Sequence, residues 1–317
     1  MSVSGKLPVI MLMGPTASGK TALGVAMAQA LNAEIISVDS ALVYKGMDIG
    51  TAKPSLVERG GIPHHLLDIL DPSEAYSTGQ FRQQALELIN AIQQRGKLPI
   101  LVGGTMLYFS ALTQGLAQLP AADASIRARL DAELAQEGKE ALHARLAAID
   151  PQAAARIHVN DPQRIQRALE VYEISGQSLS KFFDAQAAEE SPYQWLKLIV
   201  APAERQSLHE KIALRFQTML AQGLIDEVQA LYARGDLDES MPAIRCVGYR
   251  QVWSYLKGED DFASMQDKAI AATRQLAKRQ FTWLRKEQDA HPLLSDAPDL
   301  LEQALRYCQK SLMAVSG

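Results

Sequence analysis

The sequence predicts an α/β protein in which helices flank a parallel sheet, an all-helical domain is inserted, and the C-terminal part is helical. Three observations support this fold class. Short apolar runs alternate with helical patterns over the first third of the chain. An alanine-rich stretch with few strand signals follows, from about residue 116 to residue 191. The remainder contains one more apolar run and then mostly helical patterns, so we expect it to complete the core.

The first apolar run, Val9 to Met13, leads directly into a phosphate-binding loop. Its glycines expose backbone N–H groups, its lysine supplies a point charge, and its threonine hydroxyl can reach Mg²⁺. Helix-forming residues 22–31 follow, which gives the order of strand, loop and helix that a di- or triphosphate site needs. The sequence therefore predicts a P-loop NTPase-like sheet. The predicted phosphate ligands are Gly14, Pro15, Thr16, Ala17, Ser18, Gly19, Lys20 and Thr21.

Two further strands are predicted at residues 34–38 and 98–102, and a polar motif follows each one. Asp39 and Ser40 come after the first strand, and Gly103-Gly104-Thr105 come after the second. Ligands of parallel α/β proteins gather at the carboxyl ends of the strands. We therefore expect both motifs to meet the phosphate loop in one crevice.

The helical insertion is predicted to form a domain of its own, residues 116–191, within a catalytic core made of residues 1–115 and 192–317. One of its helices should begin at Pro162 and end at Gly176. An apolar stripe on this helix leaves three polar residues on exposed faces, namely Gln163, Arg164 and Arg167. After the insertion, residues 196–200 are predicted to return as a strand.

Composition limits the classes of function. The 32 basic and 36 acidic residues give a formal charge of −4, which argues against bulk attraction to nucleic acid. Two cysteines build neither a disulfide framework nor a zinc site, and no apolar run reaches membrane length, so we expect a cytoplasmic protein. Residues 274–286 carry five cations and no acid. They form either a solvated helix face or a local surface for nucleic acid.

A phosphate loop most often indicates a kinase or NTPase, which needs a second, metal-holding carboxylate at a strand end. No acid follows the strand at 98–102, whereas Asp39 follows the strand at 34–38. Asp39 is placed either to organise a metal ion or to act as a general base, and its position leaves both roles open. Arg215 falls on the apolar stripe of a helix predicted at about 208–224. It needs an anionic partner there unless its head group reaches water.

Five segments follow one another at a characteristic spacing. They are residues 14–21, Ser37-Val38-Asp39-Ser40, the block 44–54, Gly103-Gly104-Thr105-Met106-Leu107-Tyr108, and Arg245-Cys246-Val247-Gly248-Tyr249-Arg250-Gln251. Together they resemble the bacterial tRNA dimethylallyltransferase family, and the resemblance covers nearly the whole chain. The aspartate-rich DDxxD motif of prenyl-diphosphate synthases is absent, because Asp260-Asp261 is followed by Phe262-Ala263-Ser264. The diphosphate must therefore be bound by the phosphate loop.

The resemblance implies that the loop holds the diphosphate of dimethylallyl diphosphate, with Mg²⁺ bound through Thr21. It implies transfer of the prenyl group to N6 of the adenosine 3′ of the anticodon, in tRNAs that read codons beginning with U. Asp39 is then expected to accept the proton of that amine, and Thr105 to orient it. We add Arg215 as a candidate for stabilising the leaving diphosphate.

The resemblance also implies contact with the tRNA anticodon stem-loop, with the target base flipped into the site. We expect the protein to act as a monomer. Many members of the family have Met-Gln where this chain has Ala41-Leu42, which leaves open whether the contacts there come from these side chains or from the backbone. The expected tRNA contacts are Asp39, Ser40, Ala41, Leu42, Thr105, Arg127, Gln163, Arg164, Ile165, Gln166, Arg167, Arg245, Cys246, Val247, Gly248, Tyr249, Arg250, Lys278, Arg279, Gln280, Phe281, Thr282, Trp283, Leu284 and Arg285.

Two functions of other classes remain as alternatives at this point. One is an ATP-dependent kinase for a small molecule or nucleoside, in which Asp39 would act as a base toward a hydroxyl group. The other is an RNA-binding module without catalytic activity. A related prenyltransferase that modifies free AMP is disfavoured by the helical insertion and by the basic segment 274–286.

Overall fold

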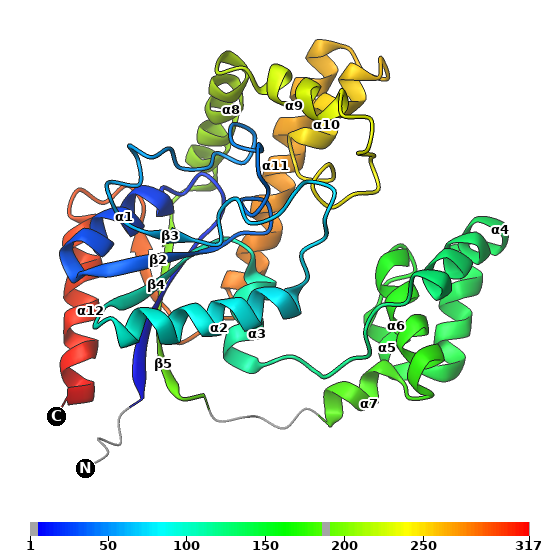
Figure 1. The fold of residues 1–317 in the computed structure, drawn as a ribbon, viewed down its shortest axis with the longest axis horizontal. Coiled ribbons are helices and arrows are strands. Elements are labelled where there is room, and N and C mark those ends of the chain that lie inside the picture. Colours follow the sequence, from blue (N-terminus) through cyan, green and yellow to red (C-terminus); the bar gives the residue numbers. More distant parts are fainter. Residues whose placement is uncertain (1–5, 186–190, 317) are drawn as a thin grey trace. The chain divides into compact units, whose positions relative to one another are not determined.

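The computed structural model describes residues 6–185 and 191–316 of the chain. The chain divides into two compact units (Figure 1). The first unit combines residues 1–113 with residues 191–317, and the second consists of residues 114–190. The boundaries predicted for the inserted domain from the sequence were residues 116 and 191. In its described part the second unit contains helices and no strand, whereas the first unit carries the sheet.

The sheet of the first unit has six strands, and every described pairing between them is parallel. The strands lie in the order β3-β2-β4-β1-β5-β6, so β1, which carries the phosphate loop, is central. The four predicted strands are confirmed, and the two edge strands β3 and β6 were not predicted. The strands are β1 (Leu7–Met13), β2 (Ala33–Val38), β3 (His64–His65), β4 (Leu98–Gly103), β5 (Tyr193–Ala201) and β6 (His291–Leu294).

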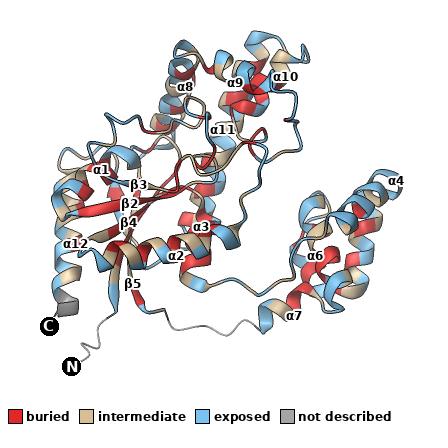
Figure 2. Ribbon diagram, viewed as in Figure 1, coloured by how far each residue is buried: buried red, intermediate tan, exposed pale blue. Residues whose placement is uncertain are grey.

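Helices cover both faces of this sheet, and the alternation of side chains along β1 decides which helices pack on which face. Ile10 and Leu12 belong to a core cluster with residues of α1 (Lys20–Leu31) and α12 (Leu300–Ser316). Val9, Met11 and Met13 belong to a cluster with α2 (Thr78–Gln94) and α3 (Met106–Gln114). Figure 2 shows the strands buried between these layers. The continuous apolar run of β1 is therefore explained by burial on both faces.

A second apolar core lies beyond the carboxyl ends of the strands, around Val43, Tyr44 and Met47. These residues belong to the block 44–54 and the turn before it, and all three are buried. Four helices that follow β5 enclose them (Figure 1). The helices are α8 (Arg205–Ala221), α9 (Leu224–Tyr232), α10 (Tyr249–Leu256) and α11 (Phe262–Leu284).

The second unit has its own core, in which Leu130, Leu146 and Leu169 are fully buried. The helix predicted from Pro162 to Gly176 is confirmed, because Asp161 accepts a hydrogen bond from the Arg164 N–H and Gly176 ends the helix in the left-handed conformation. Its helices are α4 (Ala124–Ile149, kinked at Gly138), α5 (Pro151–Arg156), α6 (Pro162–Ser175) and α7 (Leu179–Asp184).

None of the helices in the described ranges is long and apolar enough to cross a membrane. Both cysteines, Cys246 and Cys308, are unpaired.

A buried carboxylate fastens the edge of the sheet. Glu34 on β2 is 3% exposed, and it pairs with His65 (2.8 Å), Arg95 (2.6 Å) and Lys97 (3.2 Å). Burial by itself raises the pKa of Glu34, but the hydrogen bonds from these three side chains outweigh it and bring the pKa to about 2. Because β3 contributes only two residues, the ion pair with His65 adds to the few backbone bonds of that strand.

We predict that Glu34→Gln lowers the free energy of unfolding by about 2 kcal/mol at pH 7, because the charge-assisted hydrogen bonds are lost. A carboxylate with a lowered pKa in the folded chain stabilises it above the pKa of the unfolded chain, and this contribution is lost as the pH falls toward the folded value. The difference between wild type and variant should therefore shrink from pH 5 to pH 3 in urea titrations. Glu87→Gln, on the exposed side of α2, is the control. A difference that does not change with pH would contradict this account.

Candidate active site

The phosphate loop connects the end of β1 to the first turn of α1. Ala17 and Gly19 have positive φ angles of 62° and 82°, which turn the chain from the strand into the helix. At Gly14 a Cβ atom would lie 2.2 Å from the carbonyl oxygen of Val200, so only glycine fits against β5. The loop therefore delivers its N–H groups to the N-terminus of α1, where the helix dipole favours an anion.

Lys20 folds back over this loop. Its Nζ atom donates to the Pro15 carbonyl at 2.6 Å and to Ser18 Oγ at 3.5 Å. Burial lowers the pKa of Lys20 to about 7, the charge of Asp39 opposes this shift, and the charge of Arg215 adds to it. Lys20, Asp39 and Arg215 thus lie within electrostatic reach of one another, although they come from three distant segments. A bound polyanion would favour the charged form of the lysine.

Asp39 follows β2 and uses one of its carboxylate oxygens to hold a turn. Oδ1 accepts hydrogen bonds from the N–H groups of Ala41 (2.8 Å) and Leu42 (3.4 Å). Within residues 6–185 and 191–316, no hydrogen bond reaches Oδ2. One oxygen therefore has the turn-capping role that the sequence also allowed, and the other is left to accept a proton from a ligand.

Thr105 joins the end of β4 to the end of β2. Its hydroxyl oxygen accepts a hydrogen bond from the Ser40 N–H at 3.1 Å, and its own N–H donates to the Val38 carbonyl at 3.2 Å. A Cβ atom on Gly103 would lie 2.0 Å from that same carbonyl oxygen, which shows how closely the two strand ends approach. The structure therefore brings Asp39 and Thr105 together, and the Thr105 hydroxyl still has a proton to donate.

Gln280 on α11 connects the phosphate loop to the loop after β4. Its Oε1 atom accepts a hydrogen bond from the Thr16 N–H at 2.8 Å, and its Nε2 atom donates to the Gly104 carbonyl at 3.0 Å. The side chain is 8% exposed. Gln280 was predicted to contact RNA, and the structure shows that its amide also binds inside the protein. No pattern in the sequence indicates that Gln280 lies next to the phosphate loop.

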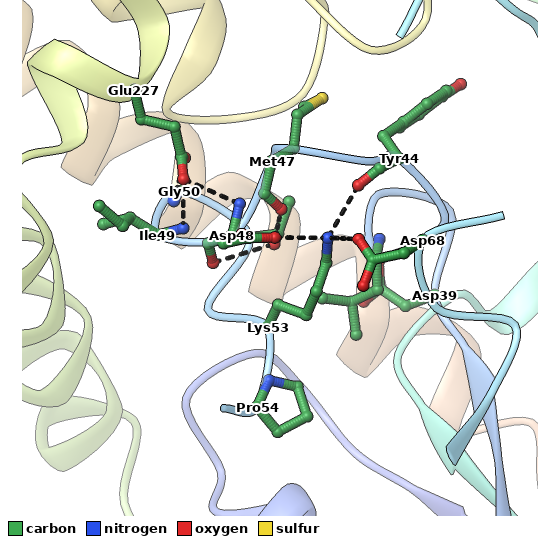
Figure 3. Close-up of polar contacts among 12 residues, drawn as sticks. Asp39, Tyr44, Met47, Asp48, Ile49, Gly50, Lys53, Pro54, Asp68 and Glu227 are labelled. Carbon is green, nitrogen blue, oxygen red and sulfur yellow. Dashed lines mark hydrogen bonds and ion pairs between the residues drawn. The ribbon is translucent and has the colours of Figure 1, made fainter. Parts of the chain in front are cut away.

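The block 44–54 folds around a buried lysine, as Figure 3 shows. Lys53, whose side chain is 3% exposed, donates to the Tyr44 carbonyl at 2.8 Å, to Asp48 at 2.6 Å, and to Asp68.

Arg215 on α8 contacts the same block. The Thr51 carbonyl accepts a hydrogen bond from Arg215 Nη2 at 3.4 Å. Burial lowers the pKa of Arg215, and the charge of Asp39 opposes this shift. The predicted cation on the apolar face of α8 is thus near an acid and held by a backbone carbonyl.

Glu227 on α9 is a polar residue of this region that the sequence analysis missed. It accepts hydrogen bonds from the N–H groups of residues 48, 49 and 50 and from the hydroxyl of Tyr249 (Figure 3 draws its contacts with the block). The only signal in the sequence is an acidic residue in the first turn of a helix, which is common and names no partner.

The residues predicted to contact RNA in the first unit divide by burial. Tyr249 and Leu284 are buried like Gln280, so their side chains support the fold, and Gly248 is buried as well. Cys246 lies close enough to Asp39 for burial and that charge to raise its pKa to about 12, which keeps it a neutral thiol. The exposed members of the set are Ser40, Arg245, Arg250, Lys278, Arg279, Thr282 and Arg285, and the half-buried ones are Ala41, Leu42, Val247, Phe281 and Trp283.

In the second unit, two of the three arginines predicted to contact RNA share one buried partner. Glu170 is fully buried and pairs with Arg127 at 2.9 Å and with Arg167 at 2.6 Å. Arg167 was expected on an exposed face, but its side chain is only 28% exposed. The reason is that burying the Glu170 carboxylate without a paired cation would cost free energy, so Arg167 turns toward it. Ile165 is buried, whereas Gln163 and Arg164 are exposed and Gln166 is half-buried.

The donor groups of the site suit a magnesium ion only together with a ligand that brings its own oxygen atoms. No three His, Cys, Asp or Glu side chains in the described ranges gather closely enough to hold a metal. Thr21 is exposed on the first turn of α1, and its hydroxyl is a hard oxygen donor of the kind that Mg²⁺ accepts. The residues present therefore fit an ion that is shared between Thr21 and phosphate oxygens.

The parallel sheet, its strand order and the loop after β1 define a P-loop protein whose site is suited to a bound di- or triphosphate. Comparison with known proteins narrows this class. A family model described as IPP transferase matches residues 42–287. The chain belongs to the IPP transferase family.

Proteins similar over the whole chain support this assignment. The chain is 55% identical to a tRNA dimethylallyltransferase from Methylococcus capsulatus, over 98% of this chain and 100% of the relative. It is also 55% identical to the enzyme of the same name from Nitrosococcus oceani, over 98% of each chain. Among solved structures, the tRNA isopentenylpyrophosphate transferase of Bacillus halodurans has a TM-score of 0.74 at 37% identity, over 98% of each chain. A eukaryotic dimethylallyltransferase acting on tRNA has a TM-score of 0.78 at 28% identity, over 98% of this chain and 78% of its own.

We predict that Gln280→Ala weakens the binding of inorganic pyrophosphate about tenfold, because the Thr16 N–H and the Gly104 carbonyl lose the group that holds them together. Calorimetric titration of pyrophosphate into both proteins measures the effect. Gln275→Ala removes the same side chain from an exposed position on the same helix and should bind like wild type. Equal affinities for all three proteins would show that Gln280 does not support the phosphate loop.

Proposed function

We propose that this protein transfers a dimethylallyl group from dimethylallyl diphosphate to N6 of the adenosine 3′ of the anticodon. The substrates are tRNAs that read codons beginning with U, and the products are N6-dimethylallyladenosine and diphosphate. The protein acts as a cytoplasmic monomer. The names of its relatives support this class of reaction. The observation that carries the proposal is the place of Asp39 at the strand ends. Thr105 joins the turn after Asp39 to the end of β4, and Gln280 joins the loop after β4 to Thr16 of the phosphate loop.

The chemistry requires a base beside a phosphate site. The exocyclic amine of adenine is a weak nucleophile, because its lone pair is delocalised into the ring. As the new bond forms between N6 and C1 of the prenyl group, the bond between C1 and the diphosphate oxygen breaks and N6 loses a proton. Asp39 Oδ2 accepts that proton, and the Thr105 hydroxyl holds the amine in line. Because Oδ1 is tied to the turn of residues 39–42, the carboxylate keeps a fixed orientation.

The diphosphate leaves with negative charge, which the phosphate loop is built to receive. Lys20, the N–H groups at the start of α1 and Arg215 place positive charge around the departing oxygens. A bound Mg²⁺, held through Thr21, would add Lewis-acid stabilisation of the same oxygens. The diphosphate thus departs into a positive environment that exists before the reaction starts.

RNA binding must come from local charge, since the whole chain is acidic. The candidates for phosphate contacts are the exposed cations in and next to α10 and α11, namely Arg245, Arg250, Lys278, Arg279 and Arg285. A base stacked in an anticodon loop cannot reach a site at the strand ends. The adenosine is therefore flipped out of its stack to reach Asp39.

An assay with labelled dimethylallyl diphosphate and tRNA tests this function against the kinase and the RNA-binding alternatives. The proposal expects the label in RNA, on one adenosine beside the anticodon, without any requirement for ATP. Label that never enters RNA, together with ATP-dependent phosphorylation of a hydroxyl group, would establish the kinase alternative instead.

We predict that Asp39→Asn lowers kcat for transfer by about 10²–10⁴-fold, the usual contribution of a general base, while tRNA affinity stays within about twofold. Asparagine keeps an oxygen that can accept the N–H groups of Ala41 and Leu42, so the turn survives and only the base is lost. Asp39→Ala removes both and should also disturb the turn. Loss of tRNA binding by the asparagine variant, equal in size to its loss of activity, would make Asp39 a structural residue.

We predict that replacing Arg279 and Arg285 together with alanine weakens tRNA binding and reduces the slope of log K against log salt by about 1.4–1.8, because two phosphate contacts are lost. Filter binding at several salt concentrations gives the slope. Arg205→Ala with Lys211→Ala removes the same charge from exposed positions on α8 and should leave the slope unchanged. A double variant at 279 and 285 with the slope of wild type would place these arginines outside the interface.

A further inference from the structure

One carboxylate on α9 organises the turn that carries the backbone partner of Arg215. Glu227 Oε2 accepts hydrogen bonds from the N–H groups of Asp48 (2.9 Å) and Ile49 (2.8 Å). Its Oε1 accepts one from the N–H of Gly50 at 3.1 Å and one from the Tyr249 hydroxyl. Three successive backbone N–H groups thus converge on one side chain, as Figure 3 shows. Such a set of N–H groups forms an anion-binding nest, and here the anion belongs to the protein itself.

Tyr249 closes this nest from the side of α10. The residue is fully buried, and burial together with the charge of Glu227 raises the pKa of its hydroxyl well above the usual range, so the hydroxyl keeps its proton and donates it. A Cβ atom on Gly50 would lie 2.5 Å from Cε2 of the Tyr249 ring. The ring therefore packs directly on the turn whose N–H groups Glu227 binds. Glu227 and Tyr249 hold this turn by hydrogen bonds and by contact.

The turn itself is compact and reaches Arg215 on its other side. Within it, the N–H of Ala52 donates to the Ile49 carbonyl and the N–H of Lys53 donates to the Asp48 carbonyl, each at 2.9 Å. The Thr51 hydroxyl donates to the Met47 carbonyl at 2.6 Å. A turn closed in this way moves as a unit, so its N–H groups and the Thr51 carbonyl cannot shift independently. Glu227 therefore fixes where the Thr51 carbonyl lies.

Arg215 depends on that carbonyl. In the described ranges, the bond to Thr51 is the one hydrogen bond that its guanidinium makes. Burial lowers the pKa of Arg215, so the charged group is held where it is poorly solvated. Without the carbonyl at its place, the guanidinium is free to adopt other rotamers on α8. The distance from Arg215 to a phosphate in the loop at residues 14–21 then varies.

We propose that Glu227 is a positioning residue for the diphosphate site, which it reaches through the turn at residues 48–53 and through Arg215. This inference rests on the proposed function, because it takes the ligand of the phosphate loop to be a diphosphate. Glu227 touches neither substrate. It sets the geometry in which Arg215 meets the phosphate, and Tyr249 supports it by donating to the same carboxylate.

Direct binding of inorganic pyrophosphate tests this role without catalysis or RNA. Glu227→Gln should weaken binding about tenfold, because an amide cannot accept all four hydrogen bonds. Asp226→Asn is the matched control, since Asp226 is the neighbouring acid in the same helical turn, is exposed and makes no hydrogen bond with the described residues. It should bind pyrophosphate like wild type. Tyr249→Phe removes one donor and leaves three, so it should weaken binding by about two- to threefold.

A double-mutant cycle separates positioning from a general loss of stability. If Glu227 acts through Arg215, then Glu227→Gln has no further effect on pyrophosphate affinity in an Arg215→Ala background. A purely structural role predicts additive losses instead, and additivity would overturn the inference. So would wild-type affinity in both Glu227→Gln and Tyr249→Phe. Failure of the wild-type protein to bind pyrophosphate is a different result, which would overturn the proposed function itself.

Discussion

The buried amide of Gln280 is the interaction on which the arrangement of the site depends. It satisfies a donor in the phosphate loop and an acceptor in the loop after β4. Gln280 lies 176 positions after Gly104 in the chain. An unpaired polar group at this depth would be costly, so the three segments hold one another in place. The same helix turns its exposed face outward with Lys278 and Arg279 next to Gln280 in sequence. A single helix thus supports the phosphate loop on one side and exposes cations on the other.

The parallel sheet positions the other residues of the site. Because β1, β2 and β4 are neighbours and run in the same direction, the residues that follow them must meet at one edge. Close backbone approach at Gly103 and the hydrogen bond from Ser40 to Thr105 make this meeting tight. Asp39 then lies near two cations, one from the phosphate loop and one from α8. The site therefore combines a carboxylate with two positively charged side chains, Lys20 and Arg215.

Much of the fold follows from local signals in the sequence. The central strands are continuous apolar runs, and the helix of the second unit has a clear start at Pro162 and a clear stop at Gly176. The two edge strands were missed because β3 has only two residues and β6 contains Pro292, so neither shows a strand pattern. Asp39, Lys20 and Thr105 were predicted together because strand-end motifs of a parallel sheet converge.

The remaining features depend on tertiary contacts that no local pattern encodes. Gln280 lies among exposed cations in the sequence and nevertheless turns inward. Arg127 and Arg167 were assigned to RNA, but the buried Glu170 binds both, and periodicity alone does not reveal which acid pairs with which base. The role of Glu227 can be recognised only once the N–H groups of residues 48–50 are known to face its carboxylate.

We propose that the phosphate loop receives a leaving diphosphate beside Asp39. A crystal structure with a dimethylallyl diphosphate analogue, in which sulfur replaces the bridging oxygen, is the sharpest test. We expect the diphosphate oxygens to be bound by Lys20 and by the N–H groups at the start of α1, with C1 of the prenyl group directed toward the side of Asp39. A diphosphate bound away from residues 14–21, or a prenyl group directed away from Asp39, would contradict it.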